Sequence, residues 1–179
     1  MLHPLRMLPP KVAWTLSLLF LWTLTTSSDG QDSNADGTAK VRREKAATEH
    51  CKKFWQSVFD RDSTEALGMT HFPLYGHKSG RSLIFKSSGE FRQPLQSLMP
   101  PTDVNVTMEI SKVTSFRSIM AEYGERMKPE EKEKLTSVLK DDDLVFDLQF
   151  KDSNGKKLDT MLTIVGWRED EPKIVGLRD

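Results

Sequence analysis

Residues 144–167 read LVFDLQFKDSNGKKLDTMLTIVGW and contain two runs in which apolar and polar side chains alternate. Asn154 and Gly155 between the runs are typical of a tight hairpin turn. In the first run one set of side chains is apolar throughout: Leu144, Phe146, Leu148 and Phe150. The alternate set is more polar: Val145, Asp147, Gln149 and Lys151. Because a strand sends successive side chains to opposite faces, the pattern predicts a β-hairpin whose apolar face is buried inside the molecule.

The rest of the chain supplies helices first and antiparallel strands last. Apolar residues at three- and four-residue spacings predict a long helix over 41–62, and a short helix over 63–70 ends before Pro73. The other predicted elements are a strand over 81–86, a helix capped by Ser87, a strand from 104 to about 120 with a phase break near Ser111, a helix over 129–139 and strands over 144–151, 157–168 and 172–178. This order indicates an α+β fold rather than a parallel sheet.

Length and charge limit the classes of function. The 179 residues suit one domain, and 26 basic side chains balance 26 acidic ones. A chain without net charge has no overall field that would attract nucleic acid or an anionic membrane surface. Cys51 is the only cysteine, so no internal disulfide can form, and its place in the apolar stripe of the first helix predicts a core side chain.

The N-terminus is typical of a secretory signal peptide. A basic lead precedes an apolar core over 12–25, which is shorter than the roughly 20 residues that span a bilayer. We therefore expect a signal peptide over 1–28, a disordered linker over 29–40 and one domain over 41–179, in a protein exported to the periplasm or the cell exterior. An uncleaved signal segment would be the chain's one contact with a membrane.

Short motifs within this element order carry a resemblance to a known superfamily. Phe54-Trp55 lies in the first helix, Pro73-Leu74 follows the second, and the final strand reads KIVGL at 173–177. Over 41–178 the chain resembles the nuclear transport factor two-like superfamily, and more narrowly its exported, uncharacterised bacterial members. The resemblance implies a strongly curved antiparallel sheet wrapped around the long N-terminal helix, a cystatin-like cone whose open end can hold a small molecule. The superfamily includes ketosteroid isomerases, dehydratases, polyketide cyclases, carriers and interaction modules, so the fold alone selects no function.

Catalysis in such a cone would need an acid or base on its inside, as the resemblance implies for the enzymes of the superfamily. The two clearest inner faces, in the strands starting near residues 104 and 144, carry no carboxylate. The candidates that are left for a catalytic role are His71, Tyr75, Tyr123 and Asp159. They lie at element ends, in loops or on a strand whose phase is ambiguous.

Ligand binding has a different set of candidates, which are the large apolar side chains expected inside the cone: Phe54, Trp55, Phe59, Phe146 and Leu148. Such side chains line apolar pockets, and they also form ordinary cores.

The sequence predicts no metal site and no cofactor. His71 and His77 have no third ligand at helical or hairpin spacing, and the acidic run over 141–143 lacks the glycine and the distal glutamate of a calcium loop. No glycine-rich phosphate loop or nucleophile motif is present in the sequence.

Two hypotheses of function follow from these observations. The first is an exported, non-catalytic domain that binds a small apolar ligand or a protein partner, with homodimerisation through the outer sheet face around Gln149 and Thr163 suggested by analogy. The alternative is an enzyme of the isomerase, dehydratase or cyclase type that acts on a small apolar substrate in the cone. We expect no nucleic-acid partner in either case.

Overall fold

The computed structural model describes residues 33–78, 80–102 and 104–179. In chain order the elements are α1 (Ser33–Phe59), α2 (Ser63–Gly68), β1 (Thr70–Lys78), β2 (Arg81–Phe85), α3 (Ser88–Leu98), β3 (Thr107–Ser115), α4 (Phe116–Tyr123), α5 (Pro129–Val138), β4 (Leu144–Lys151), β5 (Lys157–Arg168) and β6 (Glu171–Arg178). The predicted signal peptide over 1–28 lies outside the described residues.

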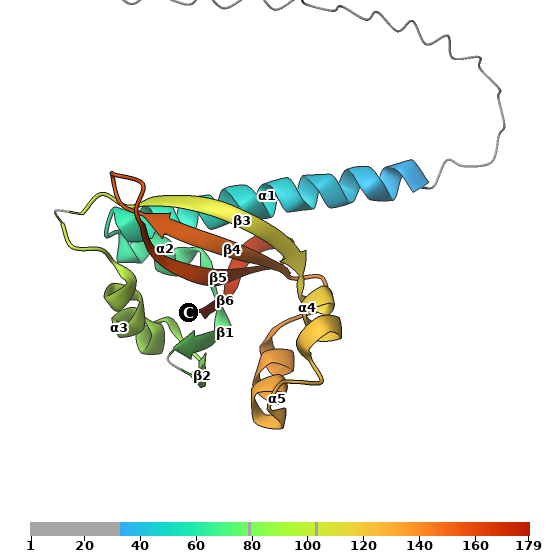
Figure 1. Ribbon diagram of the computed structural model, residues 1–179. Helices are drawn as coiled ribbons and strands as arrows, with labels where there is room; N and C mark the ends of the chain where they lie inside the picture. The colour runs from blue at the N-terminus through green and yellow to red at the C-terminus, as the bar shows by residue number, and fades with distance from the viewer. Residues whose placement is uncertain (1–32, 79, 103) are drawn as a thin grey trace, which may run out of the picture.

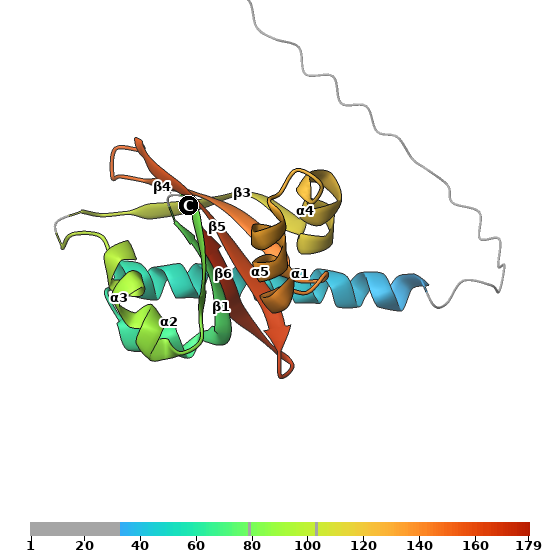
Figure 2. The ribbon, with the colours of Figure 1, turned by 90° about the horizontal axis from the view of Figure 1, so that it is seen from below.

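One curved sheet organises the domain. Its six strands follow the order β2-β1-β6-β5-β4-β3, and α1 runs along one face (Figures 1 and 2). Neighbouring strands are antiparallel except for β1 and β6, which are parallel. The predicted hairpin is present as β4 and β5, with Phe146 opposite Thr163, and Gly155 adopts the φ of 77° that its turn requires. The predicted α+β class, with a curved sheet around a long N-terminal helix, is confirmed.

The first core fills the space between α1 and the inner face of the sheet. Cys51 and Phe54 of α1 pack there with Phe146 and Leu148 of β4. Phe146 and Leu148 are 0% exposed, so the apolar face of the hairpin points inward as the sequence predicts. Burial of each large apolar side chain stabilises the fold by roughly 1.5–3 kcal/mol. Burial also raises the pKa of the Cys51 thiol to about 12, in keeping with a core side chain.

A second core lies on the opposite face of the sheet. There α4 and α5 cover Val145 of β4 and Ile164 of β5, together with Tyr75 of β1. The sequence predicts that this face looks outward, and the structure corrects that prediction, because Val145 is only 6% exposed. Leu135 of α5 packs on these strand residues, so both sides of the central sheet are hydrophobic near its middle.

Helix α4 is a further correction, since the sequence predicts that the strand from 104 continues to about 120. The strand ends at Ser115, whose side chain accepts a hydrogen bond from the backbone of the first turn of α4. Phe116, Ile119 and Met120 then recur at helical spacing and pack against the second core. The apolar residues alone are compatible with a continued strand, and the N-cap at Ser115 is the signal that indicates a helix.

Helix α1 and strand β1 also differ from the prediction. Helix α1 begins at Ser33, so residues 33–40 are helical where the sequence predicts a linker. Their mostly polar side chains give no apolar periodicity from which a helix could be predicted. The sequence predicts no strand at β1, because Pro73 indicates only the end of the preceding helix. The pairing of β1 with β6 is irregular between Thr70 and Tyr75, and a proline is tolerated where a ladder is interrupted.

A buried ion pair joins the loop before β4 to the end of β5. Both terminal nitrogens of Arg168 donate to the Asp143 carboxylate, each at 2.9 Å, and the Asp143 side chain is 0% exposed. Arg168 also donates to the Val138 carbonyl at 3.1 Å, and the Lys140 backbone donates to Asp143 at 2.8 Å. Asp143, the last residue of the acidic run over 141–143, is therefore a buried structural anchor.

Candidate functional site

A cavity of about 540 Å³ opens between the end of α1, helix α3 and the inner face of the sheet. Figure 2 shows α3 standing beside the end of α1, and β2 continues the wall on the side of α3. The apolar wall is formed mainly by Trp55, Phe59, Phe91, Leu98, Phe150 and Met161. These residues come from α1, α3 and two neighbouring strands, so the cavity exists only once all three parts are assembled.

Aromatic rings make the back wall of this cavity. The Trp55 and Phe150 ring centroids are 4.7 Å apart, and Phe59 meets Phe150 edge to face at 5.7 Å. The indole Nε1 of Trp55 donates to Thr163 Oγ1 at 2.9 Å, so its one polar atom is satisfied within the wall. Thr163 is therefore an inner-face residue that is 0% exposed, which corrects its placement in an outer sheet interface.

Asp159 is the carboxylate that the inner face of the sheet brings to the cavity. It lies opposite Phe150 and two residues before Met161, both of which are in the first core, so its side chain leaves the strand on the cavity side. Asp159 is exposed and lines the cavity, which places it at the mouth. Its Oδ1 accepts a hydrogen bond from the Thr160 backbone at 2.8 Å.

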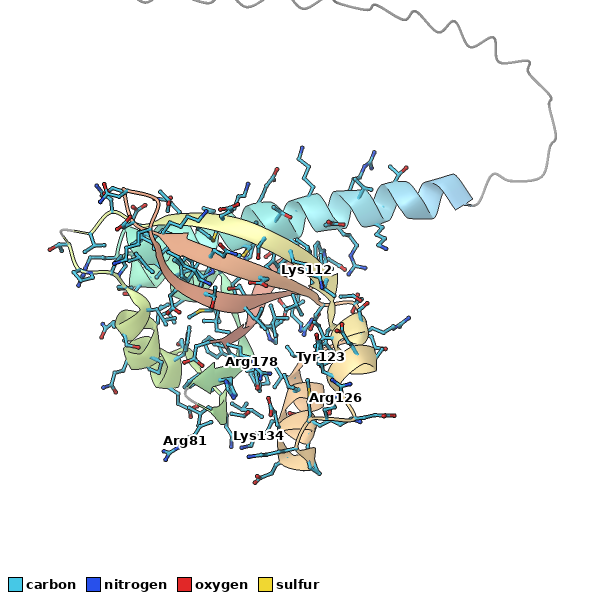
Figure 3. All side chains as sticks on the ribbon, viewed as in Figure 1. Arg81, Lys112, Tyr123, Arg126, Lys134 and Arg178 are labelled. Atoms are coloured by element: carbon cyan, nitrogen blue, oxygen red, sulfur yellow. The ribbon has the colours of Figure 1, made fainter. Side chains whose placement is uncertain are left out.

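Arg178 and His77 also line the cavity but send their side chains to the opposite face. Arg178 lies opposite Leu162, which packs on the second core, and His77 is paired with Arg178. Arg178 forms an ion pair with Glu131 of α5 at 3.0 Å. Figure 3 labels Arg178 and also Lys134 of α5. His77 Nδ1 lies 3.5 Å from the Asp179 carboxylate.

The structure does not bring the four predicted catalytic residues together. Asp159 lines the cavity, whereas Tyr75 is buried in the second core, where its hydroxyl lies 3.1 Å from Ser82 Oγ. Burial raises the pKa of Tyr75. Tyr123 is 43% exposed on α4 (Figure 3), and a hydrogen bond with Glu122 raises its pKa. His71 is half-buried near the start of β1, and burial lowers its pKa.

The predicted ligand-binding residues divide into two groups. Trp55 and Phe59 line the cavity, whereas Phe54, Phe146 and Leu148 are buried in the first core outside its wall. Sequence reasoning missed the part of the wall contributed by α3 and β2. The apolar side of α3 was visible in the sequence, but which surface it closes depends on the tertiary position of the helix.

Two kinds of feature are absent from the described ranges. Within residues 33–78, 80–102 and 104–179, no group of three or more His, Cys, Asp or Glu side chains could hold a metal ion. No helix in that part of the chain is long and apolar enough to cross a membrane.

Comparisons with known proteins bear on the fold. Neither the protein-family models nor the curated proteins give a match to the chain. An NTF2-like protein of unknown function from Silicibacter pomeroyi has a similar structure, with 15% identity, a TM-score of 0.45 and coverage of 77% of this chain and 94% of that one. An NTF2-like protein of unknown function from Shewanella baltica gives 10% identity, a TM-score of 0.46 and coverage of 77% and 92%.

Several solved structures similar to this chain are NTF2-like proteins. An uncharacterised cystatin-fold protein from Novosphingobium aromaticivorans is also similar, with 8% identity, a TM-score of 0.40 and coverage of 74% and 96%. A shared fold does not fix function.

Proposed function

We propose that the protein is a non-catalytic binding domain for a small, largely apolar ligand held in the cavity between α1, α3 and the sheet. One observation carries the proposal, namely an apolar cavity of about 540 Å³ that is continuous with the surface through Asp159 and Leu158. Ligand sites in proteins fall in a range of roughly 300–1,000 Å³ and combine apolar walls with a few polar groups. Because apolar surface is costly to hydrate, an apolar ligand would be favoured over water in this space.

The location and the assembly of the binding domain are further parts of the proposal. We propose that binding takes place outside the cytoplasm, because residues 1–28 have the pattern of a signal peptide. Fractionation of cells that produce the full chain tests this location. We separately propose homodimerisation through the part of the outer sheet face around Gln149 that α4 and α5 leave uncovered, and sedimentation of the purified chain tests it.

Binding can be measured with Nile red, an uncharged probe whose fluorescence rises in apolar surroundings. We expect a saturable rise with the native chain. The Ser97→Trp variant places an indole in the cavity from an exposed position on α3, and we expect about tenfold weaker binding because the space is occupied.

Ser137→Trp is the matched control for this variant. Ser97 and Ser137 are both exposed helix residues whose hydroxyls donate to the carbonyl three residues earlier, at 2.6 and 2.8 Å, but Ser137 lies on α5 away from the cavity. The control should bind the probe like the native chain. Equal binding by all three proteins would show that the probe sits elsewhere and would contradict the proposal.

The second candidate is an enzyme of the isomerase, dehydratase or cyclase type. Asp159 favours it, because a carboxylate beside an apolar cavity can accept a proton from a bound substrate. Such chemistry needs a second polar group aimed at the reacting atoms, and Tyr75, Tyr123 and His71 lie elsewhere. Ligand binding needs only the apolar cavity, whereas catalysis would need that second polar group as well.

A further inference from the structure

We propose that the ligand carries a cationic amine on its apolar body, and that Asp159 recognises the ammonium group. The inference rests on the proposed binding function and specifies the chemical class of the ligand. It rests on the ionisable residues that line the cavity, and on where each side chain points and which residue it contacts.

Four of the lining residues are ionisable: His77, Asp159, Arg178 and Asp179. Strand alternation sends the Arg178 side chain to the face covered by α5, where Glu131 neutralises it at 3.0 Å. His77 follows Arg178 to that face and lies 3.5 Å from Asp179. Asp159 is the lining carboxylate that has no ion-pair partner among the described residues.

The nearby lysines do not supply that partner. Lys151 is paired with Glu109 across the sheet. Lys157 lies two residues before Asp159 and is exposed, but it does not line the cavity and forms no ion pair with Asp159. Asp159 therefore lies at the mouth of the cavity without an ion-pair partner among the described residues, where an entering cation could reach its carboxylate.

The surroundings of Asp159 also suit an ammonium group. Phe150 is directly opposite Asp159 across the β4–β5 ladder, and such cross-strand neighbours have Cβ atoms about 4.5–5.5 Å apart. A cation held by the carboxylate would therefore lie near an aromatic ring, whose face attracts positive charge. The apolar body of the ligand would continue inward over Met161 and Trp55.

Three compounds with the same alkyl chain separate charge from apolar contact: decylamine, decanol and decanoic acid. Each is titrated against the full-length chain carrying Nile red, and its displacement constant is measured. We expect decylamine to compete about fivefold more strongly than decanol, the order of magnitude that an exposed ion pair supplies, and decanoic acid to be the weakest. Added salt should reduce the preference for the amine, because it screens the charge on Asp159.

Asp159→Asn should remove the preference for decylamine while decanol binds as before, which also shows that the cavity is intact. Asp147→Asn is the matched control, because Asp147 lies on the opposite face of β4 and does not line the cavity. The inference is overturned if decanol competes as well as decylamine, or if Asp159→Asn leaves the preference unchanged. If neither Nile red nor any of the three compounds binds, the proposed function itself fails and the inference falls with it.

Discussion

At the scale of single residues, the Asp143–Arg168 ion pair is buried, so the loss of one partner should destabilise the fold. Arg168→Met would leave the Asp143 carboxylate buried without its partner, and we expect the free energy of unfolding to fall by about 3–5 kcal/mol. Urea denaturation measures this change. Arg117→Met is the control, since the Arg117–Asp141 pair is exposed and its loss should cost less than about 1 kcal/mol. Equal effects of the two substitutions would contradict the anchoring role of Asp143.

His50 gives the stability a dependence on pH. Its Nε2 lies 3.1 Å from the Met69 carbonyl oxygen, and burial lowers its pKa below the ordinary value of 6.5. Because the unfolded chain then binds a proton more readily than the native state, stability is lost as pH falls through 6.5 and is fully present above it. Burial lowers the pKa of His71 as well, which adds an effect of the same sign.

The measurement for His50 is the urea midpoint at about pH 7.5 and about pH 5. We expect the native chain to lose more stability between these two conditions than the His50→Asn variant does. The variant should retain part of the loss because His71 and the carboxylates still titrate. A native chain and a variant with the same pH dependence would show that His50 does not contribute.

At the scale of elements, α1 has two parts with different support. Residues 37–45 are exposed on every side, whereas Ala47, Cys51, Phe54 and Val58 are buried. Figure 1 shows the first part extending beyond the edge of the sheet. Arg43 provides a contact there, with its guanidinium 4.7 Å from the Trp167 ring and 3.0 Å from Asp142.

A helical segment without tertiary burial is marginal in water, so the first part of α1 should open locally. We expect backbone amides over 37–45 to exchange with solvent at least about a hundredfold faster than those over 47–58. Hydrogen exchange followed by NMR measures both sets in one sample. Equal protection of the two parts would mean that the first part is covered by contacts beyond those described.

Elements with regular alternation and clear turns were predictable from the sequence. Strands β4 and β5 match their predicted ranges, and the phase break near Ser111 corresponds to the irregular register between Ile110 and Lys112. The errors fall where local signals conflict with tertiary structure. Pro73 is unfavourable in a regular strand, but β1 contains it where the pairing with β6 is interrupted. The residues at the start of α4 are also compatible with a continued strand. Such positions are decided by pairing partners that the local sequence does not identify.

At the scale of the whole molecule, the site was less predictable than the fold. The sequence predicts Trp55 and Phe59 as ligand-binding residues and Asp159 as a catalytic candidate, and all three line the cavity. Phe54, Phe146 and Leu148 have the same apolar character as Trp55 and Phe59 and lie in the core instead. Whether an inward apolar side chain meets a neighbour or a cavity depends on how α3 closes over the end of α1. The position of α3 relative to α1 is a property of the assembled domain, and the periodicity of the strands does not predict it.

The central claim is that an apolar molecule enters the space between α1, α3 and the sheet. Titration with decanol, followed through methyl signals in NMR spectra, tests it directly. We predict that the methyl signals of Val106, Met161 and Leu177, which line the cavity, shift in a saturable way, while those of Leu139 and Ile164 in the second core stay unchanged. Unchanged signals at the cavity, or shifts confined to the second core, would contradict the account.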